Sequence, residues 1–337
     1  MKTWRLTKFG LDGLAFEDAD TPAPGPGQVL VRMRAFSINY RDLMLVKGTY
    51  NPRLRFPFVP LSDGAGEVAA IGAGVTRFKV GDRVAGCFMQ RWSAGEVTEA
   101  ASKSALGGAI PGVAADYVVF EENGLVAAPE HLSLEETATL PCAALTAWHA
   151  LVSEGRIKAG DVVLTQGTGG VSLFALQFAV MSGARVIATS SSDAKLKRAL
   201  EMGASDGINY KTTEAWEDKV RELTGGAGCD HVVEVGGAGT LAKSLRAVRM
   251  GGRISLIGVL SGAAGTVNPI PILMKNVRVQ GIFVGSRAMF EDMNRAIAQH
   301  KLKPMIDRTF AFDKLPEALA HMESGGHFGK IVVRATA

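Results

Sequence analysis

The pattern of apolar and polar positions changes partway along the chain. Within the first 120 residues the two kinds alternate in short runs, which are separated by turns rich in proline and glycine. This alternation predicts short strands at residues 28–33, 66–71, 82–85 and 115–120. Long amphipathic helical patterns are scarce in this part. We therefore expect an irregular β-domain, a compact barrel of short strands.

From about Leu125 the pattern alternates between apolar strands and helices. Strands are predicted at 208–210, 231–235 and 253–259, and helices at 193–202, 213–223 and 240–250. Such alternation is typical of a parallel, doubly wound sheet. After about Ile282 a short helix at 313–324 and a strand at 330–334 follow. We expect two domains, one of residues 1–124 with 282–337 and the other of residues 125–281.

Residues 162–188 have the pattern of a dinucleotide-binding βαβ unit. An apolar strand leads through a glycine turn into a helix that is apolar almost all round, and a second apolar strand closes the unit. The glycines permit a tight turn and a close approach of backbone N–H groups to a pyrophosphate. The third position of the G-x-G-x-x-G frame is Ser172, and an ordinary strand-to-helix turn is the alternative. The residues expected to bind phosphate are Gly167, Thr168, Gly169, Gly170 and Val171.

The end of the second strand indicates which dinucleotide binds. An NAD site usually has a carboxylate here, but this chain has Thr189–Ser192, with no acidic residue before Asp193. Hydroxyl groups and a nearby lysine suit the 2′-phosphate of NADPH. A serine-rich helix cap with a solvated lysine is the alternative. The residues expected at this end of the cofactor are Ser190, Ser191, Lys195 and Tyr210.

Composition excludes several other classes of protein. In 337 residues, 47% are hydrophobic and 21% charged, which is typical of a compact globule. The net charge of +4 is spread evenly, so nucleic acid is not an expected partner. The sequence contains neither an apolar stretch that could span a bilayer nor a signal-peptide core. The three cysteines lie far apart, so we expect no disulfide scaffold and a cytoplasmic location.

Several motifs together resemble a known superfamily. They are Ser37–Asp42, Asp63–Val68, Lys79–Val84, Gly167–Val171 and Gly329–Val332. On these residues the chain resembles, nearly end to end, the zinc-free quinone oxidoreductase-like branch of the medium-chain dehydrogenase/reductases, which includes NADPH:quinone and enoyl reductases. The resemblance implies a GroES-like β-barrel catalytic domain, a Rossmann nucleotide domain, and often a homodimer joined through the sheet edge near the segment after Arg253.

The resemblance also bears on zinc. The positions that hold the catalytic metal in zinc-bearing relatives are Asn39, Ser62 and Cys142 here, and a single soft ligand cannot form a tetrahedral zinc site. The lobe that would hold a structural zinc contains only Cys87. We therefore expect no zinc. Without a Lewis acid, the substrate must spread the incoming charge itself, as quinones and α,β-unsaturated carbonyl compounds do.

The catalytic candidates follow from a second resemblance in spacing. Asn39, Asp42, Gly48 and Tyr50 are spaced as in metal-free quinone reductases and enoyl-thioester reductases. There the tyrosine lies at the substrate and acts as a proton donor. A loop aromatic that seals the barrel is the alternative for Tyr50. For Asn39 we favour orientation of substrate or cofactor, whereas Asp42 and Asp63 are expected to fix loops.

Three further segments complete the expected cofactor site. The backbone of Gly258, Val259 and Leu260 is expected at the nicotinamide carboxamide, with Phe283 and Val284 as a second such segment. Lys330 falls where relatives place a basic residue against the pyrophosphate, and a solvated strand-end lysine is the alternative.

The combined hypothesis is an NADPH-dependent oxidoreductase that passes hydride to a quinone or an α,β-unsaturated carbonyl compound without a metal. A metal-free alcohol or aldehyde oxidoreductase and a non-catalytic NADPH-binding protein are the alternatives.

Overall fold

The chain divides into two compact units in the computed structural model, which describes residues 1–262 and 264–335. The first unit is Met1–Leu145 with Val284–Ala337, and the second is Thr146–Phe283. The first boundary follows residue 145 rather than residue 124, because β7 (Leu125–Ala127) pairs with β5 and α3 (Leu134–Thr137) packs against β3 and β4. Among the described residues, no helix is both long and apolar enough to cross a membrane.

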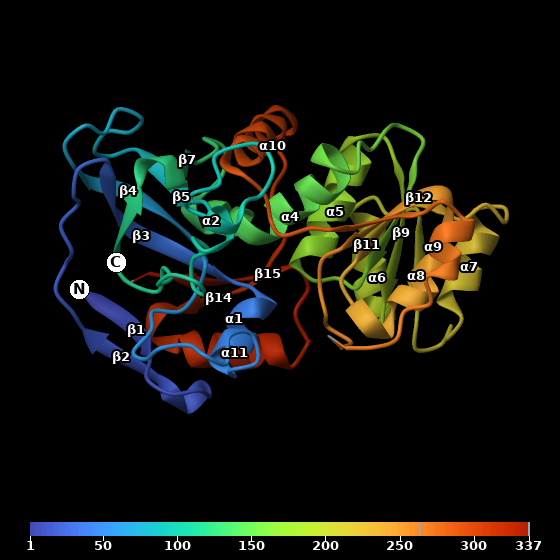
Figure 1. Ribbon diagram of the computed structural model, residues 1–337, viewed down its shortest axis with the longest axis horizontal. Helices are drawn as coiled ribbons and strands as arrows, with labels where there is room; N and C mark the ends of the chain where they lie inside the picture. The colour runs from blue at the N-terminus through green and yellow to red at the C-terminus, as the bar shows by residue number, and fades with distance from the viewer. Residues whose placement is uncertain (263, 336–337) are drawn as a thin grey trace. The chain divides into compact units, whose positions relative to one another are not determined.

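The first unit is built on a mixed sheet with the strand order β14-β15-β3-β4-β5-β7, and β6 pairs with β3 (Figure 1). A separate hairpin joins β1 (Lys2–Leu6) to β2 (Leu14–Asp18). The remaining strands are β3 (Gln28–Ile38), β4 (Asp63–Ile71), β5 (Arg83–Gly86), β6 (Tyr117–Glu121), β14 (Ile306–Ala311) and β15 (Lys330–Arg334). The other helices are α1 (Tyr40–Val46), α2 (Glu99–Ser102), α10 (Arg287–His300) and α11 (Leu315–Glu323).

Elements from both ends of the chain share the core of the first unit. Trp4 Nε1 donates a hydrogen bond to the Phe312 carbonyl at 2.7 Å, and the rings of Phe36 and Phe312 stack with centroids 4.8 Å apart. Strand β15 pairs with β3 on one side and with β14 on the other. The C-terminal segment is therefore an internal part of this unit.

The prediction missed parts of the first unit. Strand β3 extends to Ile38 instead of ending at residue 33, because β15 pairs with its second half. Helix α10 was not predicted, although Phe290, Met293 and Ile297 are buried at helical spacing. Helix α1 and strand β14 were also missed. The predicted strand at 115–120 and helix at 313–324 appear as β6 and α11 with shifted ends.

The second unit is an all-parallel sheet of six strands in the order β10-β9-β8-β11-β12-β13 (Figure 1). The strands are β8 (Val162–Gln166), β9 (Arg185–Ser190), β10 (Asp206–Asn209), β11 (Cys229–Glu234), β12 (Val248–Leu256) and β13 (Arg278–Gly281). The helices are α4 (Leu145–Trp148) at the boundary, α5 (Gly170–Met181), α6 (Asp193–Glu201), α7 (Trp216–Leu223), α8 (Leu241–Ala247) and α9 (Ile270–Met274). This confirms the predicted doubly wound sheet.

The strand order places the expected nucleotide site. The first strand of this unit, β8, lies in the middle of the sheet. Strands β9 and β10 follow on one side of it, and β11, β12 and β13 follow on the other. Ligands of such sheets bind where the order reverses, beyond the carboxyl ends of the strands. One local prediction was wrong: the helix expected to reach Met250 ends at Ala247, because Val248 already pairs with Cys229 as the start of β12.

Candidate functional site

The glycine turn after β8 has the geometry of a phosphate cradle. Gly167 has a φ of +71°, which favours glycine, and Gly169 precedes α5 as its N-cap residue. A Cβ added to Gly169 would meet no atom within 4 Å, so this side of the turn is open. Because no side chain among the described residues caps α5, its first N–H groups are available to an anion. The turn fits the pyrophosphate of a dinucleotide.

Ser172 stands where the glycine frame would place its third glycine. Its hydroxyl donates a hydrogen bond to the Gln166 carbonyl at 2.6 Å, and the residue is buried. The serine therefore joins the start of α5 to the end of β8 by a hydrogen bond. Ser172 in place of the third glycine is therefore compatible with the turn between β8 and α5.

The residues predicted for the 2′-phosphate end gather at the ends of β9 and β10. Tyr210 N donates to the Ser190 carbonyl at 3.0 Å, and the tyrosine side chain is exposed. The Ser192 hydroxyl accepts a hydrogen bond from Lys195 N at 3.4 Å and so caps α6. Lys195 is half-buried in the first turn of this helix. Asp193 accepts a hydrogen bond from Asn209 Nδ2 at 2.7 Å, so this carboxylate is engaged with an amide.

A buried carboxylate that the sequence analysis missed organises the end of β11. Glu234 is fully buried, and its Oε1 accepts hydrogen bonds from Gly236 N at 2.8 Å and Gly237 N at 3.0 Å. The hydroxyl of Thr240 donates to the same oxygen at 2.5 Å. On the other oxygen, Gln166 Nε2 donates at 2.9 Å and Ser244 donates a further bond. Glu234 thus connects the ends of β8 and β11 to the turn before α8.

The segment predicted at the nicotinamide lies against this turn. Gly258 N donates to the Glu234 carbonyl at 3.3 Å, and Leu260 N donates to the Val235 carbonyl at 3.2 Å. A Cβ on Gly258 would lie 2.4 Å from the Val235 carbonyl oxygen, so only glycine fits there. Val259 and Leu260 have exposed side chains.

The second predicted nicotinamide segment falls on the boundary between the units. Phe283 is exposed and ends the second unit, and Val284 is buried and begins the return of the chain to the first. Val284 has a φ of +57°, which is rare for a β-branched residue.

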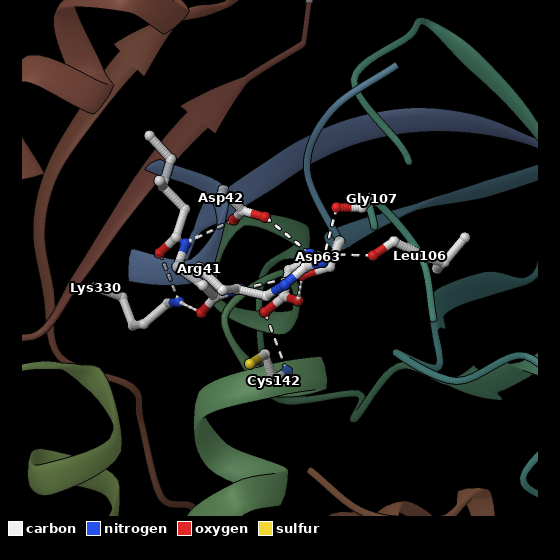
Figure 2. Close-up of polar contacts among 10 residues, drawn as sticks. Arg41, Asp42, Asp63, Leu106, Gly107, Cys142 and Lys330 are labelled. Carbon is white, nitrogen blue, oxygen red and sulfur yellow. Dashed lines mark hydrogen bonds and ion pairs between the residues drawn. The ribbon is translucent and has the colours of Figure 1, made fainter. Parts of the chain in front are cut away.

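In the first unit, Asn39 and Lys330 are brought together (Figure 2). Lys330 is 3% exposed, and its ammonium donates hydrogen bonds to Asn39 Oδ1 at 2.5 Å and to the Ile38 carbonyl at 2.8 Å. The alternative of a solvated strand-end lysine is therefore wrong. Asp42 accepts a hydrogen bond from Asn39 N at 2.8 Å and so caps the start of α1, in the structural role expected of it.

The same polar network continues through Ser62 and Asp63 to Cys142 (Figure 2). Asn39 Nδ2 donates to the Ser62 hydroxyl at 3.3 Å, which in turn donates to Asp63 Oδ1 at 2.7 Å. The second oxygen of Asp63 accepts from Cys142 N at 3.1 Å. The hydrogen-bonded chain therefore links β15, the start of α1, the start of β4 and the turn at Cys142.

Burial dominates the electrostatics of this network. It raises the pKa of Asp42 to about 6, although the Arg41 guanidinium acts in the opposite direction. Burial also raises the pKa of Asp63, with the Lys330 ammonium opposing the shift. Desolvation raises the pKa of the Cys142 thiol as well, so the thiol is neutral near pH 7.

Tyr50 lies over a fixed guanidinium. The Arg41 Cζ atom is 4.6 Å from the centroid of the Tyr50 ring, and the tyrosine is 37% exposed. Arg41 is held by the carbonyls of Leu106 at 3.1 Å and Gly107 at 2.7 Å, and by Asp42 at 3.1 Å (Figure 2). The sequence analysis did not single out Arg41.

The donor set at the three former metal positions does not fit zinc. The Asn39 oxygen is bonded to an ammonium, the Ser62 hydroxyl is bonded to Asp63, and only the Cys142 sulfur is a soft ligand. Zinc is bound in proteins by thiolate sulfur, imidazole nitrogen and carboxylate oxygen, and an amide and a hydroxyl are not among these ligands. A buried ammonium beside these groups would also repel the metal ion. No cluster of three or more metal-binding side chains occurs among the described residues.

Comparison with known proteins assigns both units. Residues 25–130 match the family described as alcohol dehydrogenase GroES-like domain, and residues 170–299 match the family described as zinc-binding dehydrogenase. A zinc-type alcohol dehydrogenase-like protein of Schizosaccharomyces pombe is 45% identical, with 96% of each chain covered. The chain belongs to the medium-chain dehydrogenase/reductase superfamily, in its quinone oxidoreductase-like branch. It is thus a nicotinamide-dependent oxidoreductase.

Further relatives carry names that differ in activity and cofactor. Human quinone oxidoreductase is 29% identical, over 94% of this chain and 92% of the human one. The crystal structure of a putative alcohol dehydrogenase from Sinorhizobium meliloti matches with a TM-score of 0.92 and 45% identity, covering 99% and 98% of the two chains. The crystal structure of an NAD-dependent alcohol dehydrogenase matches with a TM-score of 0.91 and 34% identity, and the match covers both full chains. The structure of a mycobacterial protein complexed with NADPH matches with a TM-score of 0.84 and 27% identity, covering 99% of each chain.

Proposed function

We propose that this medium-chain reductase uses NADPH to reduce quinones or α,β-unsaturated carbonyl compounds without a metal ion. The observation that carries the proposal is the donor set around Asn39: an amide bonded to an ammonium, a hydroxyl bonded to Asp63 and a single thiol stand at the positions that hold the metal in zinc-bearing relatives. A substrate that delocalises negative charge needs no Lewis acid.

The bound nicotinamide would supply a hydride, that is, a proton with two electrons. The protein would then stabilise the oxyanion that forms on the substrate and deliver a proton to it. We assign stabilisation to the Asn39 amide, which donates hydrogen bonds, and proton donation to the Tyr50 hydroxyl. Because Tyr50 is partly exposed, water can return the proton after each turnover. The sum is one hydride and one proton added to the substrate.

The test of this function is oxidation of NADPH by the purified protein in the presence of benzoquinone, naphthoquinone and cyclohexenone. We expect the nicotinamide absorbance to fall with at least one of these acceptors, and the activity to survive dialysis against a chelator. Oxidation of simple saturated alcohols alone would contradict the proposal and favour the alcohol dehydrogenase alternative that several relatives' names carry. So would about one zinc ion per chain by metal analysis.

The preference for NADPH is assigned to the hydroxyls after β9 and to Lys195. Replacing Lys195 with alanine removes a cation that would bind the 2′-phosphate, and a hydrogen bond to a charged group contributes about 1.5–3 kcal/mol. We expect the Kd for NADPH to rise about tenfold or more, and the Kd for NADH to change less than about twofold.

Lys197→Ala is the matched control for this measurement, because Lys197 lies exposed on the same helix. It should leave both dissociation constants unchanged. Equal weakening of NADPH and NADH by Lys195→Ala, or no effect on either, would place the 2′-phosphate elsewhere. Fluorescence titration of the reduced cofactors distinguishes these results.

We also propose that the enzyme is a homodimer joined through the edge of the nucleotide-binding sheet. Strand β13 is an edge strand, and α9 beside it in sequence buries none of its residues. The side chains of Leu273 and Met274 on α9 are 77% and 69% exposed. Sedimentation as a monomer at micromolar concentration would contradict this proposal.

A further inference from the structure

The buried ammonium of Lys330 determines which end of the Asn39 side chain acts as a donor. A lysine ammonium has three donor hydrogens and no acceptor, so it can bind an amide only through the oxygen. It lies 2.5 Å from Asn39 Oδ1. The nitrogen end of the amide must therefore face away from Lys330, toward Ser62.

The remaining bonds keep the same direction. The Ser62 hydroxyl donates its hydrogen to Asp63 Oδ1 at 2.7 Å, so it accepts from Asn39 Nδ2. Each hydrogen bond from Lys330 through Asn39 and Ser62 to Asp63 thus runs from donor to acceptor in one order. A flipped amide would set its NH₂ group against the ammonium and leave the Lys330 hydrogens without that acceptor.

The two ends of the amide are held unequally. The oxygen is bound at 2.5 Å by a charged donor, whereas the nitrogen donates to the Ser62 hydroxyl across 3.3 Å and also to the Asp63 carboxylate. A cation on the carbonyl oxygen withdraws electron density from the amide, which strengthens its N–H groups as donors. The donor end of the amide is therefore polarised, and a substrate oxygen would compete with Ser62 and Asp63 for its N–H groups.

We propose that Lys330 is a positioning residue for the reduction: it orients and polarises the Asn39 amide so that its N–H donates to the substrate oxygen. The inference rests on the proposed function, in which Asn39 stabilises the oxyanion. It replaces the expectation that Lys330 binds the cofactor pyrophosphate, because the ammonium is buried on Asn39 and Ile38.

The first test is Lys330→Met, which removes the cation and keeps a long side chain. We expect kcat with the best quinone or enone acceptor to fall about tenfold or more, while the Kd for NADPH changes less than about twofold. Lys330→Arg keeps a cation and should recover part of kcat. In an Asn39→Ala background, Lys330→Met should not lower kcat any further, because Lys330 acts through Asn39. A weakened NADPH affinity with unchanged kcat would overturn the proposal in favour of a pyrophosphate contact. It would also be overturned if the losses in kcat from Lys330→Met and Asn39→Ala were fully additive in the double variant.

Asn39→Asp tests the donor itself without removing the partner of Lys330. The new carboxylate keeps an oxygen on the ammonium but has no N–H, so we expect kcat to fall about 10²-fold, as for loss of one oxyanion donor. Circular dichroism confirms that the variant is folded. Wild-type kcat in N39D would overturn the proposal.

A spectroscopic measurement separates this inference from the function on which it rests. With ¹⁵N-labelled asparagine, the side-chain NH₂ signal of Asn39, assigned by its loss in Asn39→Ala, should shift and exchange faster in Lys330→Met. An unchanged signal would overturn the orienting role even if the enzyme reduces quinones. A shifted signal in a protein that reduces no acceptor would retain the role and reject the proposed function.

Discussion

Tyr50→Phe is expected to lower kcat for quinone or enone reduction by about 10²-fold or more, because a positioned general acid typically contributes 10²–10⁴-fold. The substitution keeps the ring that lies over Arg41, 4.6 Å from the guanidinium carbon, and removes only the hydroxyl. The Tyr50 hydroxyl is also hydrogen-bonded to Arg41, but the carbonyls of Leu106 and Gly107 hold the guanidinium, so we expect the ring to keep its place over it. The loss in rate therefore measures the hydroxyl.

Tyr40→Phe is the control for this experiment. Tyr40 is similarly exposed, at 43% against 37% for Tyr50, and it lies ten residues earlier, at the start of α1. It should retain wild-type kcat, and neither variant should alter the Kd for NADPH. Steady-state rates at several pH values complete the measurement. Wild-type kcat in Tyr50→Phe would favour the structural alternative for this residue, a loop aromatic that seals the barrel.

Glu234→Ala is expected to lower the free energy of unfolding by about 3–5 kcal/mol. Loss of a buried charged partner leaves its donors without acceptors, and each unsatisfied donor costs about 1–3 kcal/mol. Here the donors include the backbone N–H groups of Gly236 and Gly237 and the side chain of Gln166. Urea unfolding followed by circular dichroism measures the change.

Two further variants show whether this effect is specific to the buried carboxylate. Glu234→Gln keeps one oxygen for the backbone N–H groups, so its free energy of unfolding should fall less than that of the alanine variant. Glu222→Ala removes an exposed carboxylate that pairs with Lys219 on α7, and we expect a change of at most about 1 kcal/mol. If Glu234→Ala were as stable as Glu222→Ala, the hydrogen bonds around Glu234 would contribute nothing measurable.

Local patterns predicted the nucleotide-binding unit well because its elements are defined by neighbouring residues. The glycine turn at Gly167 and the apolar strand and helix around it are contiguous in sequence, and the parallel sheet follows from their alternation. Helix α10 also had a local signal, in the spacing of Phe290, Met293 and Ile297, and a count of apolar periodicity would have found it.

The network around Asn39 could not be predicted in the same way, since its members are distant in sequence. Lys330 and Asn39 are 291 positions apart, and Cys142 lies 79 positions from Asp63. The identity of the residues at the former metal positions was readable from the motifs. Their partners depend on how β15 pairs with β3, and no local pattern contains that pairing. Glu234 was missed because a single acid at the end of an apolar strand carries no periodic signal.

The location of β15 between two other strands of its sheet has a consequence for biosynthesis. Residues 330–334 lie between β3 and β14, yet they are translated after the whole of the segment 146–283. The inserted segment 146–283 holds its own hydrophobic core and can fold while the tail is still being translated. We expect the chain to mature from its middle outward, with the amino-terminal barrel open until β15 has been translated and can pair with β3.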